Sequence, residues 1–75
     1  MVEISLSEAK FSLENTLISL LGMDASRFID SINSATDKPG LSSIVLSTIS
    51  LLERNSHAEA AKALSHQWMK LRNRI

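Results

Sequence analysis

The absence of cysteine constrains this chain more than any other feature, because only 75 residues are available to build a core. A chain of this size buries only about 60% of the surface that its unfolded form exposes. Small domains usually compensate with disulfides, a metal, tightly packed helices or a partner chain. Without cysteine, disulfides, thiolate metal sites and a cysteine nucleophile are excluded. The sequence therefore predicts one domain, residues 1–75, that depends on helix packing and on association.

Apolar residues recur along most of the chain at the three- and four-residue spacing of amphipathic helices. We predict an all-α fold, a small bundle of three to four short helices, with helices at about 6–21, 25–34, 42–54 and 57–73. The β-branched residues within 44–49 would also suit a strand, but the apolar spacing there follows a period of 3.6 better than 2. Leu46 and Leu51 lie off the main apolar stripe, which predicts that the third helix is the central one.

Polar residues and glycine mark the predicted helix ends. Ser5–Glu8 and Ser56–Glu59 have the spacing of a capping box, and Asp24 is a typical N-cap residue. Gly22 predicts the end of the first helix, because glycine tolerates the left-handed backbone found there. The segment 36–40 is a predicted loop, since its Pro-Gly pair is typical of turns.

The sequence has no recognisable catalytic, metal-binding or cofactor-binding motif. His57 and His66 are nine residues apart, which places them on different faces of a helix. Most of the eight acidic residues lie near predicted helix ends or on polar faces, where such residues are usually solvated. We therefore predict that the chain is not an enzyme and holds neither cofactor nor metal.

Charge differs between the two halves of the chain. Residues 1–40 carry six acids and three bases and residues 41–75 carry two acids and five bases, so the formal net charge is zero. Histidine and cations recur every four residues in the last predicted helix, with Arg72 beside them: Lys62, His66, Lys70 and Arg74. This stripe would suit an anion such as nucleic acid, or an acidic protein face. It would equally complement the negative end of the helix dipole. The nucleic-acid interpretation requires oligomerisation, because one chain offers few cations.

Trp68 is the largest apolar residue of the last predicted helix, and it has two interpretations. It is either a core residue or an interface anchor, since tryptophan is enriched where proteins bind each other. Hydrophobic residues make up 44% of the chain, more than so small a bundle can turn inward. We predict a twofold homodimer in which the third and fourth helices contribute most, through Leu46, Leu51, Leu64, Trp68 and Leu71.

The first residues lack a basic start, and the apolar runs are too short for a signal peptide or a membrane span. We therefore expect a cytoplasmic protein that does not contact a membrane.

Residues 44–56 resemble a central helix of the AriR/YmgB family in the Ile-Val-Leu-Ser opening, in Ile49 and in the pair Leu52–Glu53. Leu13 and Leu17, followed by a Leu-Leu pair, look like the first helix of that family. The resemblance covers about half of the chain and implies a small enterobacterial two-component connector, linked to biofilm and acid-stress regulation. Residues 24–40 and the basic tail depart from the family pattern.

Residues 41–46 are similar, about as well, to the small dimeric helical family typified by YejL. Both resemblances imply a small helical regulator or adaptor that is often dimeric. We therefore expect a non-catalytic bacterial or phage protein that acts by protein–protein interaction, with a partner that the sequence does not name. The alternative is a dimeric nucleic-acid-binding regulator that uses the basic C-terminal helix.

Overall fold

The structure is a computed structural model that describes residues 4–75. Residues 1–3, which the predicted domain includes, lie outside the described residues. Four α-helices are present, with a short 3-10 helix, η1, between the first two: α1 (Leu6–Leu21), η1 (Gly22–Ala25), α2 (Ser26–Asn33), α3 (Lys38–Arg54) and α4 (Ala58–Leu71). Residues 4–75 form no strand, which confirms the predicted all-α fold.

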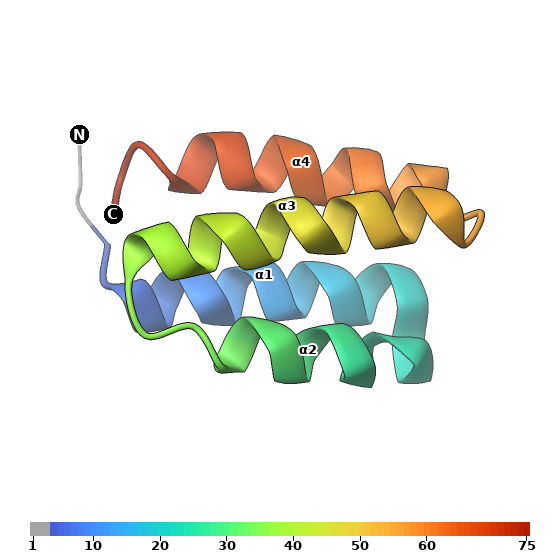
Figure 1. The fold of residues 1–75 in the computed structure, drawn as a ribbon, viewed down its shortest axis with the longest axis horizontal. Coiled ribbons are helices and arrows are strands. Elements are labelled where there is room, and N and C mark those ends of the chain that lie inside the picture. Colours follow the sequence, from blue (N-terminus) through green and yellow to red (C-terminus); the bar gives the residue numbers. More distant parts are fainter. Residues whose placement is uncertain (1–3) are drawn as a thin grey trace.

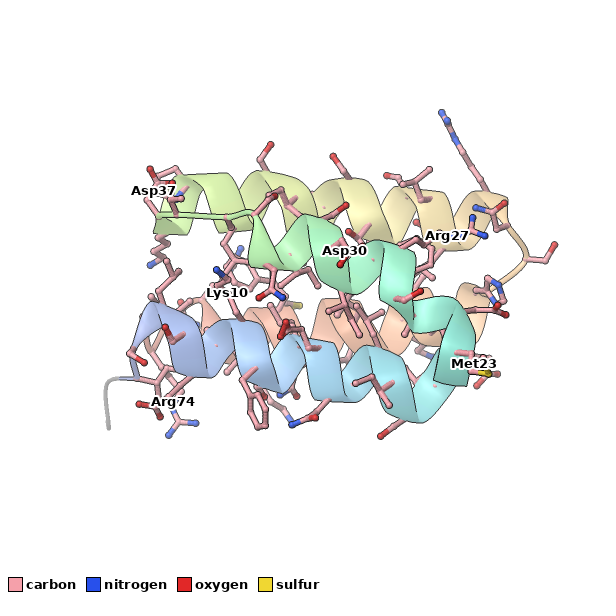
Figure 2. The ribbon with its side chains drawn as sticks, turned by 90° about the horizontal axis from the view of Figure 1, so that it is seen from below. Lys10, Met23, Arg27, Asp30, Asp37 and Arg74 are labelled. Carbon is pink, nitrogen blue, oxygen red and sulfur yellow. The ribbon has the colours of Figure 1, made fainter. Side chains whose placement is uncertain are left out.

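The four α-helices run alternately in opposite directions and pack side by side (Figure 1). α1 packs mainly against α2 and α4, and α3 packs mainly against the same two helices. α1 and α3 therefore lie at opposite corners of the bundle, as Figures 1 and 2 both show. The prediction that the third helix is central was wrong, because its off-stripe residues Leu46 and Leu51 are exposed rather than covered by neighbours.

The core is one cluster, and every α-helix contributes its apolar stripe to it. Its fully buried large side chains come from all four helices: Leu13, Leu17, Ile32, Leu41, Val45, Leu52 and Leu64. Trp68 belongs to the same cluster and is only 4% exposed, so its interpretation as a core residue is the one that holds. Thr48 is the one buried polar residue among those described, and its hydroxyl donates to the Ile44 carbonyl at 2.8 Å.

The predicted ends of α1 are confirmed. Ser5 is the N-cap, and its Oγ accepts the backbone N–H of Glu8 at 3.1 Å. The same hydroxyl donates to the Glu8 carboxylate at 3.3 Å, so the two residues close the first turn together. Gly22 follows the last residue of α1 with φ 60°, a conformation that a residue with a Cβ rarely adopts.

The predicted start of α2 was wrong in its capping residue. Asp24 lies inside η1, and the N-cap position is Ala25, which supplies no side-chain hydrogen bond. The chain runs from η1 directly into the first turn of α2, so no separate cap is needed there. The neighbouring Met23 is 94% exposed at this end of the bundle (Figure 2).

α3 begins at Lys38, four residues before the predicted start. Asp37 is its N-cap, and the Asp37 carboxylate accepts the backbone N–H of Gly40 at 2.7 Å. Pro39 lies in the first turn of α3, where backbone N–H groups have no acceptor within the helix. The N–H that proline lacks therefore costs no hydrogen bond there. The Pro-Gly pair that predicted a loop is therefore part of the helix.

The turn between α3 and α4 also differs from the prediction. Ser56 has φ 64°, and its N–H donates to Glu53, while the His57 N–H donates to the Leu52 carbonyl at 2.8 Å. These two bonds form a Schellman motif that closes α3, with serine where glycine is usual. Because Ser56 is used in this way, the predicted capping box at 56–59 does not form. α4 begins at Ala58, and it ends at Leu71 rather than at 73.

Two polar contacts between helices orient the sides of α1. The Lys10 ammonium donates to the backbone carbonyls of Asn33 at 2.9 Å and Ala35 at 2.8 Å, at the end of α2 (Figure 2). On the other side, the Gln67 amide of α4 donates to the Ser12 hydroxyl at 2.7 Å. α1 therefore presents one flank to α2 and the other to α4.

Candidate interaction surfaces

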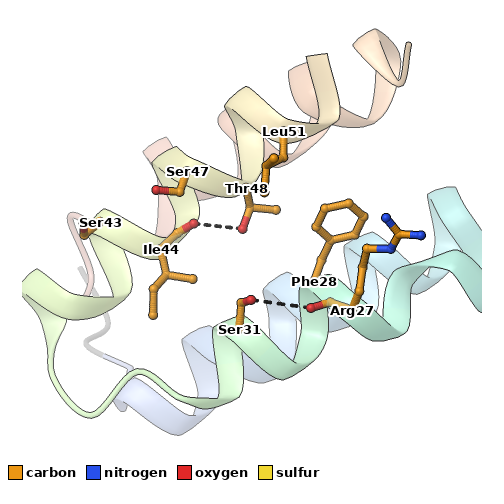
Figure 3. A pocket seen from close by; sticks show the side chains of 8 residues that line it. All are labelled: Arg27, Phe28, Ser31, Ser43, Ile44, Ser47, Thr48 and Leu51. Atoms are coloured by element: carbon orange, nitrogen blue, oxygen red, sulfur yellow. Dashed lines mark hydrogen bonds between the residues drawn. The ribbon is translucent and has the colours of Figure 1, made fainter. Parts of the chain in front are cut away.

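A groove of about 360 Å³ lies between α2 and α3 (Figure 3). Half of the residues that line it carry a hydroxyl, and the rest are mostly apolar: Arg27, Phe28, Ser31, Ser43, Ile44, Ser47, Thr48 and Leu51. α2 is half as long as α3 or less, so it covers only part of the neighbouring helix. The groove follows from this difference in length.

Two of the hydroxyls in this groove are turned back onto their own helices. Thr48 donates to Ile44 at 2.8 Å and Ser31 donates to Arg27 at 3.5 Å, as the dashed lines in Figure 3 show. Such bonds satisfy the hydroxyl locally, and the rest of the side chain is left to face the groove. The groove is therefore more apolar than its composition indicates.

Arg27 forms one wall of the groove. Its guanidinium carbon lies 5.9 Å from the centre of the Phe28 ring, within the range of a cation–π contact. The contact holds a positive charge beside the apolar floor. This arrangement suits an apolar side chain that has an acidic neighbour.

A second surface lies along α3 and α4, and we call it the α3–α4 face. One hollow of about 400 Å³ is lined by Lys38, Pro39, Ser42, Trp68, Arg72 and Asn73. Another of about 250 Å³ is lined by Ile49, Glu53, Ala58, Ala61, Lys62, Ser65 and His66. Leu46 lies four residues after Ser42 and three before Ile49, so it is on the same edge of α3, between the two hollows.

The predicted basic stripe is present on α4 over most of its length. Lys62, His66 and Lys70 are all exposed, and Met69 lies among them on the outer side of the helix. Arg72 follows the end of α4 and lines the larger hollow of the α3–α4 face.

Arg74 does not continue the predicted stripe. α4 ends at Leu71, so the four-residue spacing no longer places Arg74 on the same line. Its carbonyl instead accepts the N–H of Ile4 at 2.8 Å, which joins the first and last parts of the described residues.

The five residues predicted for self-association do not form one surface. Leu64, Trp68 and Leu71 are buried in the core of the single chain, because they share the inward stripe of α4. Leu46 and Leu51 are exposed, but Leu46 lies on the α3–α4 face and Leu51 lines the α2–α3 groove. Only these two of the five are accessible to a partner.

The sequence-based prediction missed other exposed apolar residues. Phe11 is 65% exposed, Ile18 50% and Met69 55%, and Leu20 and Met23 are exposed as well. A sequence signal existed for α1, because Phe11 and Ile18 are seven residues apart and opposite the stripe of Leu13 and Leu17. Phe11, Ile18 and Met69 are therefore candidate contact residues, whereas Met23 lies apart at the end of the bundle.

Residues 4–75 contain no group of three histidine, cysteine, aspartate or glutamate residues close enough to hold a metal ion. His57 is half-buried at the N-cap of α4 and His66 is exposed nine residues later, so the structure does not bring them together. No helix in this part of the chain has both the length and the apolar character needed to cross a membrane.

Comparisons of the chain with protein-family models, with curated proteins and with solved structures gave no significant match.

Proposed function

We propose that this chain is a non-catalytic interaction module, a small regulator or adaptor that works by packing its helix faces against another protein chain. The observation that carries the proposal is the set of large apolar side chains on the helix faces that are left outside a complete core: Phe11, Ile18, Leu20, Leu46, Leu51 and Met69. Exposed apolar side chains that gather into a patch on one face are typical of surfaces that bind. The resemblance to small helical regulators supports the same proposal.

Self-association is part of this proposal. The exposed apolar residues of α1 and those of α3 and α4 belong to different surfaces, so each copy has more than one surface to offer a neighbour. The expected cytoplasmic location and the absence of enzyme activity stay predictions.

Affinity capture tests the proposed function. The tagged wild-type chain should retain a protein in a fixed ratio from native lysate, and Phe11→Ser combined with Leu46→Ser should lose it. Met23→Ser is the control, because it removes an even more exposed apolar side chain away from both surfaces. A wild-type chain that retains no protein in fixed ratio, not even a second copy of itself, would contradict the proposal.

A dimeric nucleic-acid binder is the second candidate, and the exposed cations Lys62, Lys70 and Arg72 favour it. This function predicts weak binding whose logarithm falls steeply with the logarithm of salt concentration, in proportion to the phosphates contacted. Replacing the three cations by glutamine should abolish a gel shift. An unchanged shift in the triple variant would rule out this use of the stripe.

A further inference from the structure

We infer that this chain binds a second copy of itself head to tail, with the outer face of α1 in one copy against the α3–α4 face of the next. The outer face of α1 consists of Phe11, Glu14, Asn15 and Ile18. The inference rests on the proposed function, since it names the partner for surfaces described above.

The outer face of α1 is apolar and acidic. Its four residues have the spacing i, i+3, i+4 and i+7, which places them on one side of a helix. Lys10 reaches α2 and Ser12 contacts α4, so Phe11, which lies between them in sequence, points away from the bundle. Lys10 is the one basic residue of α1, and its ammonium is directed at the carbonyls of α2.

The α3–α4 face is apolar and basic. Leu46 is 56% exposed at its middle, and Met69, which is 55% exposed, follows Trp68 of the larger hollow on α4, so we include it in this face. Lys38 and Arg72 line the hollow at one end, and Lys62 lines the hollow at the other. Glu53 is the one acidic residue among the described residues that line either hollow. A helix with apolar and acidic residues on one side has the chemistry that this face requires.

The charge of the chain is divided between its two helical hairpins. Residues 4–36, which form the first hairpin and the loop after it, carry four acids and two bases, net −2. Residues 37–75, which begin with the N-cap of α3, carry three acids and six bases, net +3. Two copies therefore attract each other when unlike hairpins meet and repel each other when like hairpins meet. A second copy of the chain supplies a hairpin of opposite charge to each hairpin of the first, so the sequence itself indicates this partner.

The position of the two surfaces determines the symmetry of the assembly. α1 lies at the corner of the bundle opposite α3, so its outer face and the α3–α4 face point to different sides (Figures 1 and 2). A twofold dimer uses the same patch on both copies, which would place cations against cations on the α3–α4 face. A contact between two different patches instead adds copies in one direction, as an open chain or a closed ring.

Mixing two variants tests this arrangement. Phe11→Ser with Ile18→Ser disables only the outer face of α1, and Leu46→Ser with Met69→Ser disables only the α3–α4 face. All four side chains are half exposed or more, so the variants should keep the helix content and cooperative melting of the wild type, which circular dichroism checks. Met23→Ser and Leu51→Ser are the matched controls, because these apolar residues lie outside both surfaces.

Sedimentation equilibrium of each sample gives the outcome. The wild type and both controls should exceed two copies of 8.3 kDa as concentration rises. Each double variant alone should associate at least about tenfold more weakly. An equimolar mixture of the two double variants should form a species of two chains and grow no further, because each variant keeps one intact surface.

Three results would overturn the inference. Either double variant that still forms a dimer by itself would indicate a twofold interface. Loss of association in Leu51→Ser would place the second copy in the α2–α3 groove. A wild type that stays at 8.3 kDa at every concentration would exclude self-association. In that last case the proposed function would still be decided separately, by the capture of a different protein.

Discussion

The two helical hairpins of this bundle differ in how their ends are held. α2 has only eight residues and no side-chain N-cap, and the carbonyls at its end accept hydrogen bonds from Lys10 of α1. α3 has 17 residues, begins with the Asp37 cap and ends in the Schellman turn at Ser56. Because short isolated helices are marginal in water, α2 depends on contacts with other helices. α3 instead satisfies its two ends with its own cap and its own closing turn.

The hairpins also carry opposite net charges. The contacts at the helix ends act within one chain, and the net charges act between chains. End contacts determine how each hairpin is held within one chain, whereas the opposite net charges determine which surfaces attract between chains. Substitutions at helix ends should therefore change stability and leave association in place. Substitutions on the outer faces should do the reverse.

The largest expected effect falls on the core that the two hairpins share. Trp68→Ala should lower the free energy of unfolding by about 3–5 kcal/mol, because a buried indole leaves a cavity behind. Urea denaturation followed by circular dichroism measures the change. Met69→Ala, one residue along on the exposed side, should cost less than about 0.5 kcal/mol when measured at a concentration where the chain is monomeric. Equal costs for the two would contradict the placement of Trp68 in the core.

Gly22→Ala should be next in size and should act on the first hairpin. Gly22 has φ 60° and ψ −127°, and a Cβ added there would meet no atom within 4 Å. The cost therefore comes from the backbone alone, about 1–3 kcal/mol. Thermal unfolding compared with Ser19→Ala, an exposed position inside α1, measures it. An unchanged melting temperature would show that the end of α1 does not need this conformation.

Lys10→Met should lower the stability of α2 by about 1–2 kcal/mol, since two backbone carbonyls at its end lose a charged hydrogen-bond donor. Hydrogen exchange should show the loss of protection in α2 before it shows any in α3. Lys62→Met removes an exposed cation from the other hairpin and should leave the exchange of α2 unchanged. Equal effects from the two substitutions would mean that Lys10 does not support α2.

Ser56→Gly should give the smallest effect, and its sign is opposite. Ser56 adopts φ 64° in the Schellman turn, where glycine has no steric cost, so the variant should be stabilised by about 0.5–1 kcal/mol. A rise in melting temperature relative to wild type would agree with this. A fall would mean that the serine side chain supports the turn in a way that its backbone does not explain.

The helices could be predicted from the sequence because apolar spacing and local caps are local signals. The bounds predicted for α1 match those observed, since Ser5 and Gly22 mark them within a few residues of chain. The start of α3 was missed because proline and glycine are typical of turns, and only the Asp37 cap shows that here they begin a helix. Asp24 and Ser56 were misassigned as N-caps. Asp24 lies inside the 3-10 helix η1, and Ser56 adopts a positive φ in the turn that closes α3.

The candidate surfaces were harder to predict than the helices. The charge difference between the halves could be read directly, and so could the stripe from Lys62 to Lys70. Which apolar residues are exposed depends on where α2 and α4 lie against their neighbours, and spacing within one helix does not contain that information. For this reason Leu64 and Trp68 were assigned to an interface, although they are buried, and Met69 was overlooked. Phe11 was missed although its position opposite the buried stripe of α1 was a usable signal.

The central claim is that the two hairpins carry complementary outer surfaces through which copies associate. Sedimentation equilibrium of the unmodified chain, over a concentration series at low and at high salt, tests it most directly. The average mass should rise from 8.3 kDa past twice that value at low salt, and high salt should reduce it, because salt screens the attraction between the hairpins. A mass that stays at 8.3 kDa at low salt, or one that rises only when salt is added, would contradict the claim.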